Sequence, residues 1–145
     1  DHFLPADLAL LALLESSFET HATSRVGAKG IWQFMENPGK KFLLINSARR
    51  LDERLSPLKS TLAAAQLLQQ NKRLVGTWAG AITAYNSGPR AITRQGRWAR
   101  DEQLVWKAFV PCQSSIGWAG RNYYPGFLAI VRAIRYRDVF FGKAP

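Results

Sequence analysis

One glutamate lies where carboxylates are uncommon, on the apolar face of a predicted helix. Leu8, Leu11, Ala12 and Glu15 follow one another at spacings of three and four residues, which places all four on one helix face. Burial among leucines is expected to raise the pKa of Glu15 and keep its proton available near neutral pH. A general acid for glycosidic-bond cleavage needs that property. A surface glutamate at a helix end, turned to solvent, is the competing interpretation.

The remaining reactive residue types exclude several kinds of site. Cys112 is the only cysteine, so the chain has no internal disulfide. One cysteine and two well-separated histidines also exclude a Cys/His zinc site. We therefore expect no metal.

The elements that must position Glu15 are predicted to be helices. The first begins near Pro5, because the first turn of a helix accepts proline. Ser60 is expected to cap a second helix over residues 61–74, which is rich in alanine and leucine. Between these helices a turn or helix start is expected at residues 27–30, and Pro38-Gly39 is expected to close the segment that follows.

The rest of the chain is also predicted to be helical. Thr77 can cap a helix that ends at Gly88-Pro89, and residues 101–109 indicate another short helix. Residues 110–121 are expected to form a loop, with Pro125 opening the last helix. Leu11, Trp32 and Trp78 are assigned to the core. Strand-like alternation is scarce and no linker is visible, so the fold class is all-α.

Length and composition limit the class of protein. The 145 residues can bury one sizeable core, and 47% hydrophobic residues exclude disorder, so residues 1–145 are predicted to form a single domain. No stretch approaches the roughly 20 apolar residues that cross a bilayer, so no transmembrane segment is expected. The chain starts at Asp1 and its only methionine is Met35, which predicts that a signal peptide, lipid anchor or further domain lies upstream.

The charge is strongly positive and uneven. Of the formal net charge of +10, most lies in residues 86–145, which carry 10 basic and 3 acidic side chains. Such a balance favours polyanions, whether nucleic acid, an anionic membrane surface or a bacterial cell wall; a solvated surface tuned for solubility is the alternative. Arg90, Arg94 and Arg97 recur at helical spacing as an exposed basic face. No helix-turn-helix or basic-region motif is visible, so no nucleic-acid partner is expected.

Several motifs occur in an order that resembles one enzyme family. They are Leu14-Glu15-Ser16-Ser17-Phe18, His21-Ala22-Thr23-Ser24, Gly27-Ala28-Lys29-Gly30-Ile31-Trp32-Gln33-Phe34-Met35, Leu51-Asp52-Glu53-Arg54, Ala84-Tyr85-Asn86-Ser87-Gly88 and Arg121-Asn122-Tyr123-Tyr124-Pro125-Gly126. Together they resemble the lytic transglycosylases of bacterial cell walls, of the soluble type and above all of the membrane-bound type D branch. The resemblance covers about residues 4–131 and implies a single lysozyme-like (goose-type or SLT) helical domain with a glycan-binding groove.

The resemblance also implies roles for individual residues. Glu15 corresponds to the family's single catalytic acid, and the substrate-binding positions correspond to Ser24, Gln33, Met35, Tyr85, Asn86 and Tyr123. Among these, Tyr85 would orient the catalytic carboxyl group. Structural interpretations stand beside these roles: Gln33 could satisfy a helix end, the tyrosines could be core aromatics, and Asn86 could be a helix cap.

The implied reaction needs only one carboxylic acid. Glycosidases of the two-carboxylate kind hold a second Asp or Glu about 5 to 10 Å away. In the resembling family, one glutamate protonates the glycosidic oxygen between N-acetylmuramic acid and N-acetylglucosamine, then accepts the proton of the C6 hydroxyl as a 1,6-anhydro ring closes. No metal or cofactor is implied. The implied partner is the glycan strand of peptidoglycan, reached by an extracytoplasmic protein that acts as a monomer.

Some positions depart from the family pattern. Glu36-Asn37-Pro38 replaces P-x-T, Phe42-Leu43-Leu44 replaces Y-G-L, and Ala119-Gly120 replaces Glu-Thr, while residues 95–118 match nothing in the family. These departures keep open a lysozyme-like hydrolase that acts on modified, for example de-N-acetylated, peptidoglycan. Outside the enzymes, a non-catalytic wall-binding module or a basic nucleic-acid-binding helical domain remain alternatives.

Overall fold

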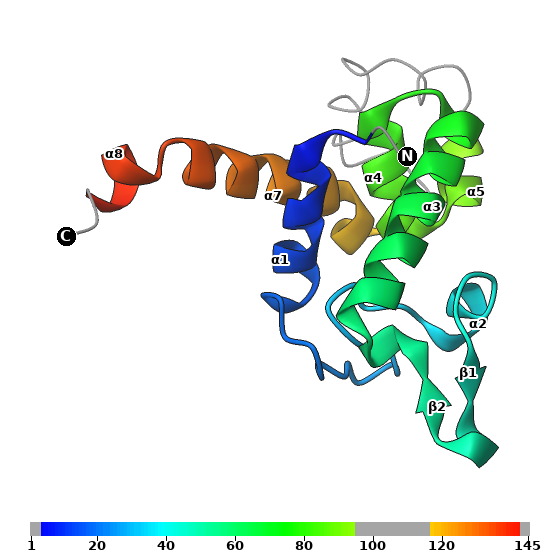
Figure 1. Cartoon of the computed structure of the whole chain (residues 1–145). Helices are drawn as coiled ribbons and strands as arrows, with labels where there is room; N and C mark the ends of the chain where they lie inside the picture. The colour runs from blue at the N-terminus through cyan, green and yellow to red at the C-terminus, as the bar shows by residue number, and fades with distance from the viewer. Residues whose placement is uncertain (1–3, 95–116, 143–145) are drawn as a thin grey trace. The chain divides into compact units, whose positions relative to one another are not determined.

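Helices predominate in the computed structural model, which describes residues 4–94 and 117–142 (Figure 1). The all-α prediction is confirmed, and the strands among the described residues form one small hairpin. The chain divides into two compact units, Asp1–Gln66 and Leu67–Pro145, and helix α3 (Pro57–Val75) crosses their boundary. The predicted helix at residues 101–109 lies outside the described residues. That the whole chain is a single domain stays a prediction.

The first unit opens with the predicted amphipathic helix. A 3₁₀ turn at Ala6–Leu10 continues directly into α1 (Leu11–Ser16). Leu8, Leu11 and Ala12 are buried, which confirms the apolar face that the spacing predicts. Burial of one leucine side chain contributes about 1.5–3 kcal/mol to folding. Because a helix this short is not stable on its own, packing of its apolar face is what stabilises it.

The chain leaves α1 through two residues in the left-handed region. Ser17 ends the helix with φ 54°, and Phe18 follows with φ 62°. Neither is glycine, and the left-handed conformation costs about 1–2 kcal/mol for each such residue. The turn directly after Glu15 and Ser16 is therefore strained.

A short helix and a hairpin follow in the same unit. The helix α2 (Glu36–Gly39) contains Pro38 and ends at Gly39, which agrees with the prediction that Pro38-Gly39 closes this segment. Proline is tolerated there because the first N–H groups of a helix have no intrahelical partner. Strand β1 (Ile45–Asn46) pairs antiparallel with β2 (Leu51–Asp52) across a 3₁₀ turn at Ser47–Arg49, and a second 3₁₀ turn spans Glu53–Leu55.

The helix α3 begins earlier than predicted, and Ser60 is not its cap. Pro57 is the first helical residue, and the side-chain oxygen of Ser56 accepts a hydrogen bond from the Lys59 N–H at 3.4 Å. Ser60 is buried inside the helix, where its hydroxyl donates to the Ser56 carbonyl oxygen at 2.7 Å. Serine followed by proline at the first helical position is the stronger start signal.

The second unit contains the helix that the sequence predicts after Thr77. The Thr77 hydroxyl accepts a hydrogen bond from the Gly80 N–H at 3.0 Å, which caps α4 (Trp78–Ser87) as predicted. The helix ends at Gly88, whose φ of 78° suits glycine, and α5 (Pro89–Thr93) follows. The core of this part contains Val75, Ala81, Ala84 and Ile92, with Trp78 and Ala91 packed against it.

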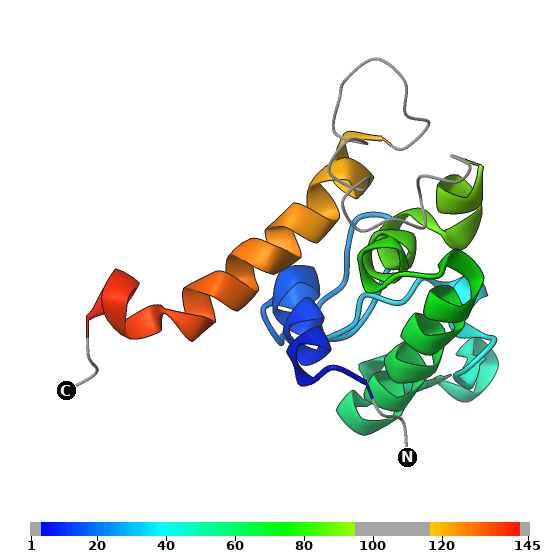
Figure 2. The same cartoon turned by 90° about the horizontal axis from the view of Figure 1, so that it is seen from above.

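The last long helix includes the proline that was expected to open it. The helix α7 (Trp118–Arg135) passes through Pro125, so the predicted loop is wrong at residues 118–121, while residues 110–116 lie outside the described residues. Gly120, Tyr123 and Phe127 are buried at helical spacing, and α7 packs against α4. Burial of this face outweighs the hydrogen bond that Pro125 removes. Figure 2 shows α7 along its length, with α8 (Arg137–Phe141) turning away from its end.

Candidate active site

The segment from Ala22 to Phe34 forms a closed loop, which carries two of the predicted site residues. Within it, Lys29 forms isolated antiparallel β-bridges with Thr23 and with Phe34. The Gly30 N–H donates to the Ala22 carbonyl oxygen at 2.9 Å. These backbone hydrogen bonds define the loop without a helix or sheet, and we call it the Ala22–Phe34 loop.

Gln33 crosses this loop with its side chain. Its Nε2 donates to the Gly30 carbonyl oxygen at 2.8 Å and to the Ala22 carbonyl oxygen at 3.3 Å. Its backbone is left-handed, with φ 47°. The interpretation that Gln33 only satisfies a helix end is wrong, because both carbonyl groups belong to the loop. Since the amide N–H groups serve the loop, the side-chain carbonyl oxygen of Gln33 is the group suited to accept a hydrogen bond from a ligand.

Ser24 shapes the other side of the loop. Its hydroxyl oxygen accepts a hydrogen bond from the Ala28 N–H at 3.0 Å, and its backbone N–H donates to the Ala28 carbonyl oxygen at 2.9 Å. A further turn bond joins the Gly27 N–H to the Ser24 carbonyl oxygen at 3.0 Å. The Ser24 hydroxyl is thus held as an acceptor by the backbone, which leaves its proton suited to donate to a ligand.

Glu15 lies near the end of α1 and is half-buried, as its place on the apolar face predicts. The next residue, Ser16, connects this helix end to the loop. Its hydroxyl lies 3.0 Å from the Ile31 carbonyl oxygen and 3.3 Å from the Ala12 carbonyl oxygen. The first unit therefore brings the helix of Glu15 together with the loop of Ser24 and Gln33. Sequence reasoning had assigned no role to Ser16.

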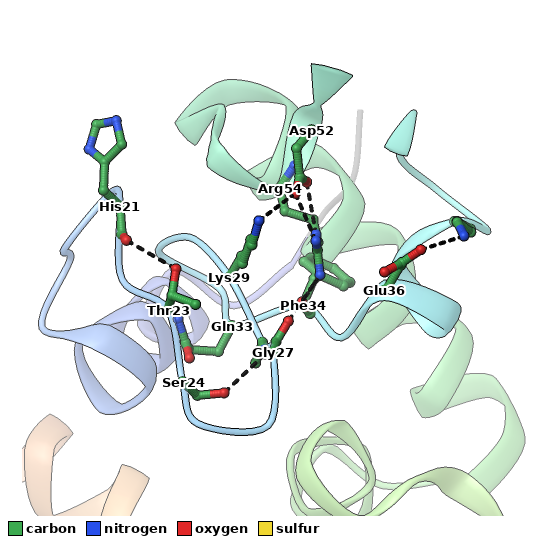
Figure 3. A network of polar contacts seen from close by, with 12 residues as sticks. His21, Thr23, Ser24, Gly27, Lys29, Gln33, Phe34, Glu36, Asp52 and Arg54 are labelled. Carbon is green, nitrogen blue, oxygen red and sulfur yellow. Dashed lines mark hydrogen bonds and ion pairs between the residues drawn. The ribbon is translucent and has the colours of Figure 1, made fainter. Parts of the chain in front are cut away.

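A buried arginine supports the loop from outside, and sequence reasoning missed it as well. Arg54 is only 3% exposed. Its Nε and Nη2 donate to the two carboxylate oxygens of Asp52 at 2.8 and 2.7 Å (Figure 3). Its Nη1 donates to the carbonyl oxygens of Gly27 and Phe34 at 3.1 and 3.2 Å. Lys29 adds an ion pair from within the loop, with Nζ 3.3 Å from Asp52 Oδ2.

The charges of this network reinforce each other. Hydrogen bonds from the Arg54 guanidinium hold the pKa of Asp52 below its ordinary value, although burial acts in the opposite direction. The same hydrogen bonds raise the pKa of Arg54. Both groups are therefore charged at neutral pH. The only sequence signal for this ion pair was the Asp52-Glu53-Arg54 motif. An arginine two residues after an aspartate does not by itself indicate that the two side chains are paired or buried.

The chain passes very close to Arg54 at Gly30. A Cβ on Gly30 would lie 1.9 Å from the Arg54 carbonyl oxygen, and the φ of Gly30 is +75°. Both the contact and the backbone conformation require glycine. Met35 follows the loop directly and is 41% exposed, which suits a residue that lines an open surface.

The other predicted site residues belong to the second unit. Tyr85 and Asn86 occupy the last turn of α4, where Tyr85 is half-buried and Asn86 is exposed. Tyr123 is buried on α7, the helix that packs against α4. The unit thus gathers Tyr85, Asn86 and Tyr123 on two neighbouring helices. Their part in one site with Glu15 stays a prediction.

The positions that depart from the family pattern lie in α2, directly before β1 and at the start of α7. Leu43 is buried, while the exposed Leu44 donates its N–H to a Glu53 carboxylate oxygen at 2.8 Å. Ala119 and Gly120 occupy the first turn of α7. Arg90 and Arg94 are exposed as predicted, and Arg97 lies outside the described residues.

The described part of the chain shows neither a metal-ligand cluster nor a membrane-spanning helix. Within residues 4–94 and 117–142, no group of three His, Cys, Asp or Glu side chains could hold a metal ion. None of the helices in those ranges is both long and apolar enough to span a membrane.

Comparison with known proteins identifies the family of the chain. The Transglycosylase SLT domain family matches residues 2–104, and the chain belongs to this family, as the motifs predicted. It is 41% identical over 92 residues to the membrane-bound lytic murein transglycosylase D of Escherichia coli (strain K12). The same protein of Escherichia coli O6:H1 (strain CFT073) is similar to the same extent. Each match covers 63% of this chain and only 20% of the relative's length.

Proposed function

We propose that this domain cleaves the β-1,4 bond between N-acetylmuramic acid and N-acetylglucosamine in peptidoglycan, with Glu15 as the single acid and base. Membership of the Transglycosylase SLT domain family supports the reaction class. The observation that carries the assignment of Glu15 is the hydrogen bond from its neighbour Ser16 to Ile31, at 3.0 Å. It ties the half-buried carboxylate's helix to the loop that offers Ser24 and Gln33 as hydrogen-bonding groups.

One carboxyl group suffices for the proposed reaction. Glu15 gives its proton to the glycosidic oxygen as the bond from that oxygen to C1 of the muramyl sugar breaks. The C6 hydroxyl oxygen of the same sugar then bonds to C1, and its proton returns to Glu15. The products are a free 4-hydroxyl group and a 1,6-anhydromuramyl end, and water is not consumed.

Other side chains would bind and orient the glycan. Ser24 would donate a hydrogen bond and Gln33 would accept one, while Met35 would contact a sugar face. Tyr85 would orient the carboxyl group of Glu15, and Asn86 would bind the glycan. Tyr123 would complete the same groove.

The setting of the reaction belongs to the proposal as well. The relatives' name includes murein, so the proposed partner is the peptidoglycan strand, and the proposed place of action is extracytoplasmic. We propose that the domain acts as a monomer without a cofactor. Its net charge of +10 would favour retention on a wall rich in carboxylates.

Digestion of purified sacculi tests the proposed reaction and its acid together. Muropeptides released by the wild-type domain are expected to be lighter by one water molecule than reducing muropeptides, as mass spectrometry can resolve. Glu15→Gln keeps the shape of the side chain but has no proton to give, and it is expected to lower the rate about 10²- to 10⁴-fold. Glu19→Gln, at an exposed glutamate four residues further along the chain and beyond the end of α1, is the matched control and should retain activity.

Each contrary result of this digestion has a separate meaning. Reducing ends in place of anhydro ends would identify a lysozyme-like hydrolase, and faster digestion of de-N-acetylated sacculi would support that alternative. Equal rates for wild type and Glu15→Gln would show that Glu15 is not the acid. Binding to sacculi without cleavage would identify a wall-binding module.

A further inference from the structure

We propose that Asp52, Arg54 and Lys29 are positioning residues that hold the Ala22–Phe34 loop in the shape that binds glycan. We call these three residues the loop clamp. The inference rests on the proposed function, since it concerns how the same site binds its substrate. It assigns a task to charged side chains that take no part in the proposed chemistry.

The geometry of Arg54 is the first argument. Through Nη1 it donates to the carbonyl oxygens of Gly27 and Phe34, at 3.1 and 3.2 Å, which lie at the tip and at the end of the loop. Gln33, whose carbonyl oxygen is suited to a sugar, directly precedes Phe34. A shift of the Phe34 carbonyl group would therefore move Gln33 as well.

The second argument is that Arg54 itself cannot shift easily. The two oxygens of Asp52 accept from Nε and Nη2 in a fork, at 2.8 and 2.7 Å, and the guanidinium group is buried. A bidentate pair of this kind fixes orientation as well as distance, which a lysine cannot reproduce. The guanidinium is thereby aimed at the two loop carbonyl groups.

Lys29 supplies a second connection to Asp52, from within the loop. Its Nζ lies 3.3 Å from Asp52 Oδ2, and its backbone N–H and carbonyl oxygen are each 3.1 Å from their partners in Phe34. Figure 3 shows the Lys29 and Arg54 side chains meeting at the carboxylate of Asp52. The loop is thus held at its tip, at its middle and at its end.

The clamp is expected to govern glycan affinity more than the bond-breaking step. Its hydrogen bonds and ion pairs reach Gly27, Lys29 and Phe34, while the helix of Glu15 is connected to the loop through Ser16 and Ile31. Weakening the clamp should therefore disturb Gln33 and Ser24 first. A purely structural network would instead lower stability and leave the affinity of the folded protein unchanged.

The test measures binding in a protein that cannot turn over its ligand. In the Glu15→Gln background, the Kd for soluble, uncrosslinked peptidoglycan glycan strands is measured by calorimetry, well below the lowest melting temperature of the set. We expect Arg54→Lys to raise Kd about tenfold or more, and Lys29→Met to raise it several-fold. Lys29 is half-exposed, so Lys29→Met keeps the test available if Arg54→Lys does not fold.

A neighbouring ion pair supplies the matched control. Lys59 Nζ lies 3.7 Å from Glu53 Oε1, and Glu53 is the residue between Asp52 and Arg54. Among the described residues, neither side chain forms a hydrogen bond or ion pair with the loop. Lys59→Met should leave Kd unchanged. Lys29→Arg, which keeps the ion pair to Asp52, should restore most of the affinity that Lys29→Met loses.

A second measurement needs no glycan. Amide hydrogen exchange at Gly30, Gln33 and Phe34 should accelerate in Arg54→Lys and Lys29→Met, and the side-chain amide resonances of Gln33 should shift. Unchanged Kd in folded variants would overturn the proposal, and faster exchange with unchanged Kd would show that the network is purely structural. If the Glu15→Gln parent binds no glycan, the proposed function fails, and the exchange data then decide whether the clamp holds the loop.

Discussion

At the scale of single residues, the Ala22–Phe34 loop contains two glycines that both have a positive φ angle but lie in different surroundings. Gly30 has φ +75° and approaches Arg54 so closely that a Cβ would lie 1.9 Å from the carbonyl oxygen. Gly27 has φ +85°, but no heavy atom lies within 4 Å of a Cβ built on it. The pair therefore separates the effect of close contact from the effect of backbone conformation.

We predict that Gly30→Ala destabilises the protein far more than Gly27→Ala does. Gly27→Ala should lower the free energy of unfolding by about 1–2 kcal/mol, which is the cost of a left-handed alanine. Gly30→Ala adds a collision with backbone and should lower it by about 2–5 kcal/mol. Urea denaturation of both variants measures the difference, and equal losses would contradict the close approach.

Residues whose role depends on nearby sequence were predictable, and residues with distant partners were not. Leu11 and Trp32 are buried as predicted, because apolar spacing decides burial locally. Arg54 was missed since its partners Gly27 and Phe34 are 27 and 20 residues away in the chain. No local pattern distinguishes a buried arginine from a solvated one.

At the scale of elements, neighbouring residues compete as the start of a helix, and the accuracy of each predicted helix boundary depends on which residue is the stronger signal. Thr77 was predicted correctly because no stronger cap lies next to it. Ser60 was wrong because Ser56 and Pro57 form a better helix start four residues earlier. Pro125 was wrong because the buried face of α7 outweighs the local preference of proline.

The unfavourable position of Pro125 in α7 leads to a prediction. Pro125→Ala restores a backbone donor inside the helix and should raise the free energy of unfolding by about 1–2 kcal/mol, after the greater entropy of the unfolded chain is taken into account. Thermal unfolding followed by circular dichroism measures the gain. Ala129→Gly, at an exposed position of the same helix, is the opposing control and should cost about 1 kcal/mol. A loss on Pro125→Ala would mean that the packing of α7 depends on the proline.

At the scale of the whole molecule, acidic residues are the minority charge, and one of them, Asp52, pairs with two cations. Ten acidic residues face 20 Lys and Arg residues, and Asp52 has two cationic partners. Because its pKa is lowered in the folded protein, the ionised form of Asp52 stabilises the fold. This contribution is complete above the ordinary pKa of 3.8 and is lost as the pH falls through the lowered value.

We therefore predict that Asp52→Asn matters least in acid. The difference in unfolding free energy between wild type and Asp52→Asn should be largest above about pH 5 and should shrink as the pH falls to about 2. Chemical denaturation at a series of pH values measures it. Asp138→Asn removes an exposed carboxylate that pairs with Arg137, and it should change stability little throughout. A difference for Asp52→Asn that does not vary with pH would contradict the pairing.

The close approach of Gly30 to the Arg54 carbonyl group also has a consequence for the order in which this unit folds during synthesis. The loop that carries Ser24 and Gln33 is synthesised before Asp52 and Arg54, and the contacts of its clamp join residues that are 20 to 27 positions apart. During synthesis the N-terminal part of a chain emerges first, so Arg54 leaves the ribosome well after the loop that it must hold. Until Arg54 has been synthesised, the close packing of Gly30 against the Arg54 carbonyl group cannot form. The proposed glycan-binding loop is thus translated before the residues that clamp it, and it can reach its final shape only after those residues have been made.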